Sequence, residues 1–229
     1  MRRTALTHLE TYLQTARVLH ASTFPTEEGH AHPSYLVVLE GGVGVLAKPE
    51  DEIGDGQVLV RREVGAWIVA REMGWLDLVS TTVLRPMKSP KHGAMVDASF
   101  QIVWPNPLPN APLETFDDED VWRAAVFDFL VHQTDRGGHN WLAVPGPGEG
   151  HFPQLKLTDH GYAFDESRGN AQSTFLDAKR GEEVPFDALE AVRRLRARLP
   201  SSEVSDHMTM EVIDQVTGRA DSLLASGRF

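Results

Sequence analysis

A proline-rich segment near the middle of the chain restricts the fold more than any other local feature. Residues 104–112 contain four prolines in nine positions. Each proline fixes its backbone φ angle and lacks an N–H donor, so the segment excludes both a helix and a central strand. The sequence therefore predicts a linker here, with a separate lobe before it and another after it.

The residues before this linker have mainly the pattern of strands. Strands are predicted at residues 34–39, 43–48, 81–84 and 99–104. Gly41 and Gly42 lie between the first two runs, and a Gly-Gly pair in that position is typical of a tight hairpin. Apolar residues recur at helical spacing over residues 60–68, and Gly74 is a suitable end for that helix. The first part is therefore expected to be mostly β with one helix.

The residues after the linker have mainly the pattern of helices. Asp117 or Asp118 is a suitable N-cap for a helix that runs to about His132. Further helices are predicted at residues 186–199 and from Ser201 or Ser202 onward, and short strands at 141–144 and 154–158. The expected fold is α+β and bilobal. It has a small β-rich N-lobe at residues 1–104, a linker at 105–113 and a mainly helical C-lobe at 114–229.

Composition excludes several classes of protein. The 229 residues carry 33 acidic and 22 basic side chains, a formal net charge of -11, so a nucleic-acid partner is not expected. The absence of cysteine excludes disulfides and thiolate metal sites. An uninterrupted apolar run of about 18 residues, as a transmembrane helix requires, does not occur. We expect a soluble cytoplasmic protein.

Two acidic motifs in the second half carry the chemistry. Asp135-Arg-Gly-Gly-His-Asn140 is followed, after the two predicted strands, by Asp159-His-Gly161. Phosphotransferases use such an arrangement, with a catalytic aspartate, and an asparagine and a second aspartate that bind Mg²⁺. Asp135 is the predicted catalytic residue, and Asn140 and Asp159 are the predicted metal ligands. The alternative for the first motif is a simple turn between a helix and a strand.

Two residues of the first half supply complementary charges. Lys48 ends a predicted strand, and Glu63 lies beside the apolar stripe of the predicted helix, where a carboxylate needs a partner. Taken singly, each residue is more typical of a solvated surface side chain. Taken with the acidic motifs, they predict an ion pair in which Glu63 holds Lys48 for binding phosphate groups.

Other chemistries have weaker support. The ten histidines form no compact metal-binding motif, although a zinc hydrolase using Asp135, His139 and Asp159 remains an alternative. His160 is expected to be a packed or hydrogen-bonded residue and not a ligand. The nucleophile-elbow, Walker and dinucleotide-binding motifs do not occur, so acyl transfer and those nucleotide folds lack support.

The order of these motifs resembles that of a known family. Together with Ala47-Lys48-Pro49, residues 62–67 and Met73-Gly74-Trp75, they are similar to the phosphatidylinositol 3/4-kinase-like branch of the protein-kinase-like superfamily. The similarity is to its compact actinobacterial members and, more distantly, to HipA-like serine/threonine kinases, over residues 35–164.

The resemblance implies a bilobal kinase fold that binds ATP and Mg²⁺ between its lobes. It assigns phosphate binding to Lys48, metal binding to Asn140 and Asp159, and catalysis to Asp135. It also implies that the backbone of residues 101–104, with Gln101 and Val103, meets the adenine.

The chain departs from the family pattern in two places. A glycine-rich loop over the phosphates is missing; residues 20–34 occupy its position, with Ser22 and Thr23 as candidate phosphate-binding residues. A lipid-headgroup pocket is not identifiable after Gly161, so the expected acceptor is a protein hydroxyl or a small molecule. The alternatives are a nucleotide-binding pseudokinase that acts as a scaffold, and a kinase-fold enzyme that transfers another nucleotide-derived group.

Overall fold

The computed structural model describes the chain except for residues 1, 25–33, 51–55, 147–152 and 202. Its internal contacts divide it into two compact units. Unit 1 comprises Met1–Val64 and Ser80–Val103, and unit 2 comprises Gly65–Val79 and Trp104–Phe229. The predicted domain boundaries, with a linker at 105–113, stay a prediction.

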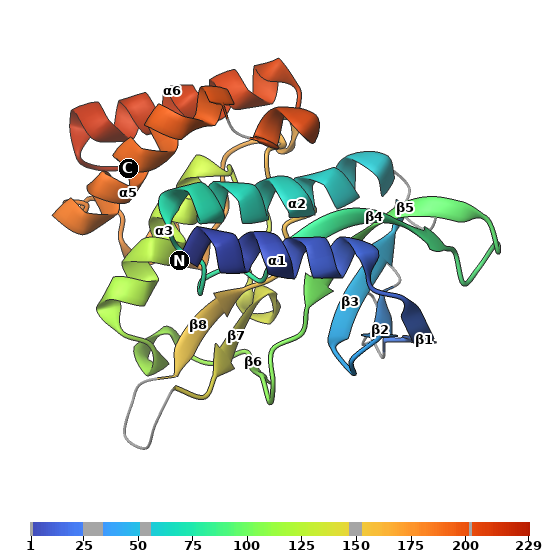
Figure 1. Cartoon of the computed structure of the whole chain (residues 1–229). Coiled ribbons are helices and arrows are strands. Elements are labelled where there is room, and N and C mark those ends of the chain that lie inside the picture. Colours follow the sequence, from blue (N-terminus) through green and yellow to red (C-terminus); the bar gives the residue numbers. More distant parts are fainter. Residues whose placement is uncertain (1, 25–33, 51–55, 147–152, 202) are drawn as a thin grey trace. The chain divides into compact units, whose positions relative to one another are not determined.

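Unit 1 is built on an antiparallel sheet with the strand order β1-β2-β3-β5-β4. Its strands are β1 Val18–Thr23, β2 Tyr35–Leu39, β3 Gly44–Pro49, β4 Thr82–Lys88 and β5 Met95–Ile102 (Figure 1). The β2–β3 hairpin turns at Gly41 and Gly42, whose φ angles of 91° and 83° favour glycine. The predicted hairpin and the two further strands are therefore present.

Two elements of unit 1 were not predicted. Helix α1, Arg2–Thr15, packs against β4 and inserts Leu13 into the core beside Val37 and Phe100, and Ala16, just after the helix, joins the same core. Strand β1 pairs with β2 although its described side chains are all exposed. The expectation of a single helix in the first half was wrong, because tertiary packing and backbone pairing stabilise these elements.

Helix α2, Gly56–Met73, follows the sheet hairpin in the sequence. It ends where the sequence predicted, at Gly74, which has a φ angle of 84°. The division between the units falls within this helix, after Val64. Glu63 therefore belongs to unit 1, whereas Trp67 and the following turns belong to unit 2.

Unit 2 contains a small antiparallel sheet in the order β6-β7-β8. Its strands are β6 Leu108–Pro109, β7 Trp141–Val144 and β8 Gln154–Leu157. Strand β6 is a two-residue edge strand inside the proline-rich segment, a position that proline tolerates. The two predicted strands that flank the Pro145-to-Pro153 connection are present; residues 147–152 of that connection lie outside the described part.

The helices of unit 2 follow the sequence prediction with two shifts. They are α3 Asp118–Leu130, α4 Thr174–Ala178, α5 Phe186–Arg198 and α6 Met210–Ser226, with 3₁₀ turns at Leu113–Thr115, Gly138–Asn140, Glu166–Arg168, Leu199–Ser201 and Glu203–Asp206. Asp117 caps α3 as expected, and α5, whose N-cap is Pro185, ends at Arg198, one residue before its predicted end. The last helix begins at Met210, with Thr209 as its N-cap, and not at Ser201 or at Ser202, which lies outside the described residues.

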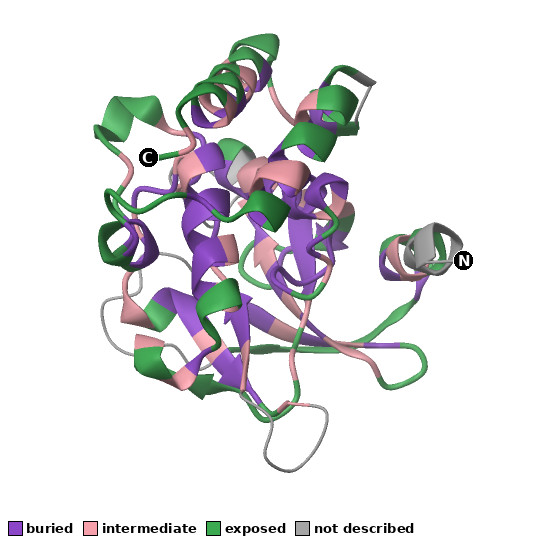
Figure 2. Ribbon diagram, turned by 90° about the vertical axis from the view of Figure 1, so that its left-hand side faces the viewer, coloured by how far each residue is buried: buried purple, intermediate pink, exposed green. Residues whose placement is uncertain are grey.

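Helix α6 is amphipathic, with one side buried against the rest of unit 2. Ile213, Val216, Ala220 and Leu223 of α6 are buried, while the polar residues between them are exposed or partly exposed. Figure 2 shows this pattern as purple and green segments alternating along the helical ribbons. Within the described residues, no helix is both long and apolar enough to cross a bilayer.

Candidate functional site

Unit 1 contains the ion pair that the sequence predicted. Lys48 Nζ of β3 lies 2.5 Å from Glu63 Oε1 of α2. The two side chains are 14% and 3% exposed, so the carboxylate is almost completely removed from water. A buried carboxylate without a partner is costly, and Lys48 supplies the compensating charge. The pair is present; its part in binding phosphate stays a prediction.

The candidate phosphate-binding residues of unit 1 lie at the sheet edge. Ser22 and Thr23 are exposed residues of β1, paired across the ladder with Leu36 and Tyr35. Residues 25–33, which form most of the segment proposed to cover the phosphates, lie outside the described part. The role of Ser22 and Thr23 therefore stays a prediction.

The candidate adenine-binding residues lie at the end of β5. Gln101 pairs with Leu46 on one side and Thr82 on the other, and its buried side chain donates to Thr82 Oγ1 at 3.2 Å. Val103 lies just past the strand and donates its N–H to the Gly44 carbonyl at 3.3 Å. Gln101 is thus an interior residue of the sheet, whereas Val103 is exposed. Their contact with a nucleotide stays a prediction.

In unit 2 the first acidic motif is organised by a buried ion pair. Asp128 of α3 and Arg136 have side chains with 0% exposure, and Arg136 Nη2 lies 3.0 Å from Asp128 Oδ1. Arg136 Nε also donates to both carboxylate oxygens, at 3.2 and 3.1 Å. Ser173 adds a further donor, with Oγ 2.7 Å from Asp128 Oδ2. These bonds compensate the cost of burying both charges.

The same arginine joins the two segments that carry the predicted metal ligands. Arg136 Nη1 donates to the carbonyl oxygens of Asn140, at 2.8 Å, and Thr158, at 2.5 Å. The Thr158 N–H also donates to the Asn140 carbonyl at 3.1 Å. Asn140 Nδ2 donates to the Asp135 carbonyl at 2.5 Å, which fixes the amide orientation. Oδ1 is then the atom that the predicted metal site would use. Asp135, Asn140 and the residue before Asp159 therefore belong to one network.

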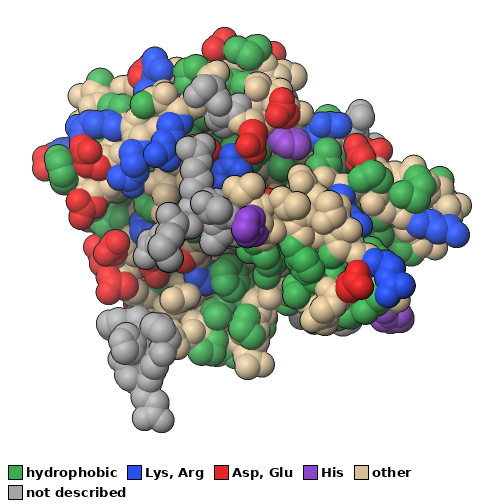
Figure 3. Space-filling view, in the orientation of Figure 1, with side chains coloured by type: hydrophobic (Ala, Val, Ile, Leu, Met, Phe, Trp, Pro, Cys, Tyr) green, Lys and Arg blue, Asp and Glu red, His purple; other side chains and the backbone are tan. Residues whose placement is uncertain are grey.

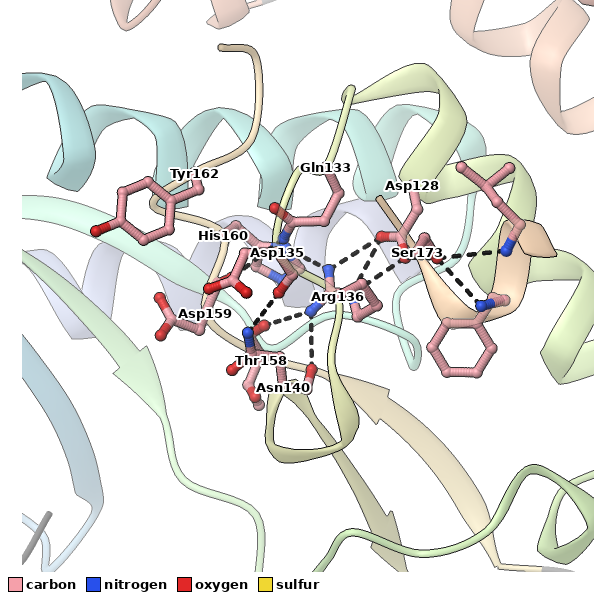
Figure 4. Close-up of polar contacts among 12 residues, drawn as sticks. Asp128, Gln133, Asp135, Arg136, Asn140, Thr158, Asp159, His160, Tyr162 and Ser173 are labelled. Atoms are coloured by element: carbon pink, nitrogen blue, oxygen red, sulfur yellow. Dashed lines mark hydrogen bonds and ion pairs between the residues drawn. The ribbon is translucent and has the colours of Figure 1, made fainter. Parts of the chain in front are cut away.

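Asp159 lies at a turn in the left-handed region. Its φ angle is 53°, and its carbonyl accepts a hydrogen bond from Gln133 Nε2 at 3.2 Å. The positive φ falls on Asp159 itself and not on Gly161, the glycine of the same motif. Aspartate tolerates this conformation better than most residues. In Figure 4, Asp159 and Asp128 lie on opposite sides of Arg136.

His160 is a structural member of the network, as the sequence suggested. It is completely buried, with Nδ1 3.1 Å from Arg136 Nη2 and its ring edge-on to Phe127 at 5.5 Å. An arginine can only donate, so Nδ1 is the accepting nitrogen and the ring proton is on Nε2. His160 therefore helps to orient Arg136.

The geometry gives no support to a zinc site. Among the described residues, no group of three or more histidine, aspartate or glutamate side chains is placed to hold a metal. This covers the alternative with Asp135, His139 and Asp159; His30, His32 and His151 lie outside the described part. Magnesium bound with a nucleotide requires fewer protein ligands, because phosphate oxygens and water complete its shell.

Sequence reasoning did not single out Asp128, Arg136 or Ser173. One signal was available, since Asp128 is a lone charge within the apolar stretch Ala124-Ala-Val-Phe-Asp-Phe-Leu130. A charge on the buried side of a helix requires a partner. The identity of that partner depends on how residues 133–136 and 173 return to α3, which local patterns do not specify.

Neither a protein-family model nor a curated protein matches the sequence. Solved structures do match the fold. The Golgi casein kinase with Mn/ADP bound has a TM-score of 0.70 and 11% identity, over 97% of this chain and 75% of that one. The Helicobacter pylori proinflammatory kinase CtkA has a TM-score of 0.52 and 12% identity, over 94% of each chain.

These similarities identify the fold. The chain has an α+β protein-kinase-like fold, with a β-rich sheet in its N-terminal region and helices in its C-terminal region. The fold predicted from the motif order is therefore confirmed. At 11% and 12% identity the similarity extends to the fold alone.

Proposed function

We propose that this protein is an ATP- and Mg²⁺-dependent phosphotransferase, a kinase. The supporting observation is that one buried arginine binds the backbone at Asn140 and at Thr158, next to Asp159. In a protein-kinase-like fold these are the positions expected to hold a metal ion. The donor set fits Mg²⁺, which prefers carboxylate and neutral oxygen ligands.

Each residue has a proposed role within its own unit. In unit 2, Asn140 Oδ1 and the Asp159 carboxylate would hold the metal, which would neutralise phosphate charge, and Asp135 would accept the proton of the acceptor hydroxyl. In unit 1, Lys48 would bind ATP phosphates while its ion pair with Glu63 fixes the position of its ammonium. Ser22, Thr23, Gln101 and Val103 are proposed to complete nucleotide binding.

We further propose a protein hydroxyl or a small molecule as the acceptor, in an enzyme of the phosphatidylinositol 3/4-kinase-like or HipA-like type. Arginines of the C-terminal helices are paired with carboxylates, as in Arg193–Glu190 and Arg196–Asp221. Figure 3 shows Lys and Arg side chains in blue close to red Asp and Glu side chains on this face. Such a mixed surface does not favour binding to an anionic lipid.

The test is transfer of labelled phosphate from ATP by the wild type and by Asp135→Ala and Asp159→Ala. Loss of the catalytic base or of a metal ligand should reduce transfer about 100-fold or more. Asp177→Ala is the matched control, because Asp177 is an exposed aspartate of unit 2 that pairs with Arg180. Equal transfer by the wild type and both site variants would reject the assignment.

A second candidate is a nucleotide-binding pseudokinase that acts as a scaffold. It is favoured by the segment at residues 20–34, which contains a single glycine, Gly29, where kinases have a glycine-rich loop. Tight ATP binding without hydrolysis or transfer would support this candidate. A mass shift on the product distinguishes transfer of phosphate from transfer of another nucleotide-derived group.

A further inference from the structure

The guanidinium of Arg136 uses its full set of donors. Nε donates to the Asp128 carboxylate, and Nη2 donates to Asp128 Oδ1 and to His160 Nδ1. Nη1 donates to the carbonyls of Asn140 and Thr158. An arginine has five N–H groups, and all five have an acceptor here. The planar group therefore has one orientation that satisfies all its bonds.

The segment after Asp159 returns to this network by backbone pairing. Gln172 donates to the Gln133 carbonyl at 2.8 Å and accepts from the Arg136 N–H at 3.0 Å. This brings Ser173 to the Asp128 carboxylate, where its hydroxyl donates at 2.7 Å. Figure 4 shows Ser173 and Asp128 on the same side of Arg136. Asp128 thus receives donors from both the Asp135 loop and the segment after Asp159.

We infer that Asp128 and Arg136 are positioning residues that set the spacing of the metal ligands Asn140 and Asp159; this inference rests on the proposed function. Asp128 fixes the orientation of the guanidinium. The guanidinium in turn fixes the backbone carbonyl of Asn140 itself and that of Thr158, the residue before Asp159. Both segments are therefore held before a metal binds, and little ordering is needed on binding.

The Arg136→Lys variant tests the positioning role of this side chain separately from its charge. An ammonium keeps the positive charge opposite Asp128, but its three N–H groups cannot reproduce a planar arrangement of five. Asn140 and Thr158 would then lose their common donor. Asp128→Asn tests the other partner, because an amide keeps the volume but cannot accept all the bonds that the carboxylate accepts.

The experiment measures Mn²⁺ binding by electron paramagnetic resonance in the presence of saturating ADP. Arg136→Lys and Asp128→Asn should bind Mn²⁺ about 10 to 100 times more weakly than the wild type. ADP affinity without metal should stay within about twofold, because only the metal ligands are displaced. Raising the Mn²⁺ concentration should restore full occupancy in both variants.

Arg123→Lys is the matched control. Arg123 is another arginine of unit 2, on α3, and it pairs with Asp77 at 2.5 Å and Asp120 at 3.0 Å. Its hydrogen bonds to described residues go to those two carboxylates and not to the Asp135 loop. It should lose stability without a change in Mn²⁺ affinity. All measurements are made below the lowest melting temperature of the set.

The possible outcomes are distinguishable. A wild type that binds no Mn²⁺ with ADP would reject the proposed function itself. A wild type that binds, with Arg136→Lys binding equally well, would overturn the positioning role and leave the function intact. A loss shared equally by Arg123→Lys would also overturn it, because the effect would then follow stability.

Ser173→Ala keeps the inference testable if the two buried variants do not fold. It removes one donor to Asp128 and a cap of α4 but leaves the guanidinium intact. A several-fold loss of Mn²⁺ affinity is expected, smaller than for Arg136→Lys. Unchanged affinity in this variant would count against the role of Asp128.

Discussion

Lys156 places an ammonium group inside unit 2. The residue is 1% exposed, its Nζ lies 4.5 Å from the centre of the Trp104 ring, and it donates to the Asp77 carbonyl. Burial lowers the pKa of Lys156 below 10.5, and the nearby carboxylates of Asp77 and Asp120 offset part of this effect. The stability of the fold is therefore linked to pH through this residue.

The free energy of unfolding of the wild type should rise with pH in the alkaline range, and the Lys156→Met variant should lack this rise. Between the lowered folded pKa and 10.5 the unfolded chain binds the proton and the folded chain does not, so the free energy of unfolding increases with pH. One such group contributes at most about 1.4 kcal/mol per pH unit. Urea unfolding of both proteins between pH 7 and pH 10.5 measures the difference in slope. Lys88→Met, at an exposed lysine, is the control. If the free energy of unfolding changed with pH equally in Lys156→Met and in the wild type, the prediction would be contradicted.

The buried residues differ in how far the sequence predicted them. Glu63 was expected to face inward because its helical position lies beside an apolar stripe, and its partner Lys48 was expected from the position of both residues ahead of the acidic motifs. Arg136 belongs to the motif that begins at Asp135. Its partner Asp128 lies before it in the sequence, and the end of α3 and a turn separate the two residues. The closing of that turn is a tertiary event, so the pair was not predicted.

Helix α3 carries Asp128 and leads into the Asp135 loop, so its N-terminus affects the whole region. Asp117 accepts a hydrogen bond from the Glu119 N–H at 3.0 Å, and three acidic residues, Asp118, Glu119 and Asp120, lie in the first turn. A side-chain cap satisfies a backbone donor that the helix itself leaves unpaired. The carboxylate also interacts favourably with the helix dipole.

Replacing Asp117 by alanine should lower the free energy of unfolding by about 1 kcal/mol, because the cap is lost. Asparagine at this position keeps the capping oxygen and should lose less than half as much. The midpoint of urea unfolding, at an unchanged slope, measures both effects. Equal losses for the alanine and asparagine variants would show that the charge, and not the cap, stabilises the helix.

Elements with strong local signals were predicted, and those without were missed. The β2–β3 hairpin, the end of α2 at Gly74 and the start of α3 each have a glycine turn or a capping aspartate. Strand β1 has no buried face, so it lacks the alternation that identifies a strand. Helix α1 depends on Leu13 entering the core of unit 1, which its own sequence does not reveal.

The chain as a whole should be stabilised by nucleotide and metal together. A ligand that binds only the folded state, at about 100 times its dissociation constant, adds about 2.7 kcal/mol. For a chain of this length that corresponds to a melting temperature about 5 to 10 °C higher. Thermal melting with Mn²⁺ and ADP measures this shift.

The Asp159→Asn variant identifies the part of the shift in melting temperature that depends on the metal. It should keep the shift that ADP produces alone and lose most of the additional shift with Mn²⁺, because a neutral amide is a weaker ligand than a carboxylate. An additional shift of the same size in this variant would contradict metal binding at Asp159. A full shift in the wild type without phosphate transfer would favour the scaffold alternative.

The sequence by itself determined the α+β organisation and many of the element boundaries, because turns, caps and apolar periodicity act over a few residues. The kinase-like fold was expected from the resemblance that the order of the motifs carries. The tertiary structure decided which side chains support the predicted site. Asp128, Arg136, His160 and Ser173 meet only when α3, the Asp135 loop and the segment after Asp159 pack together. Their hydrogen bonds span up to 45 positions in the sequence, a separation at which local patterns carry no information about pairing.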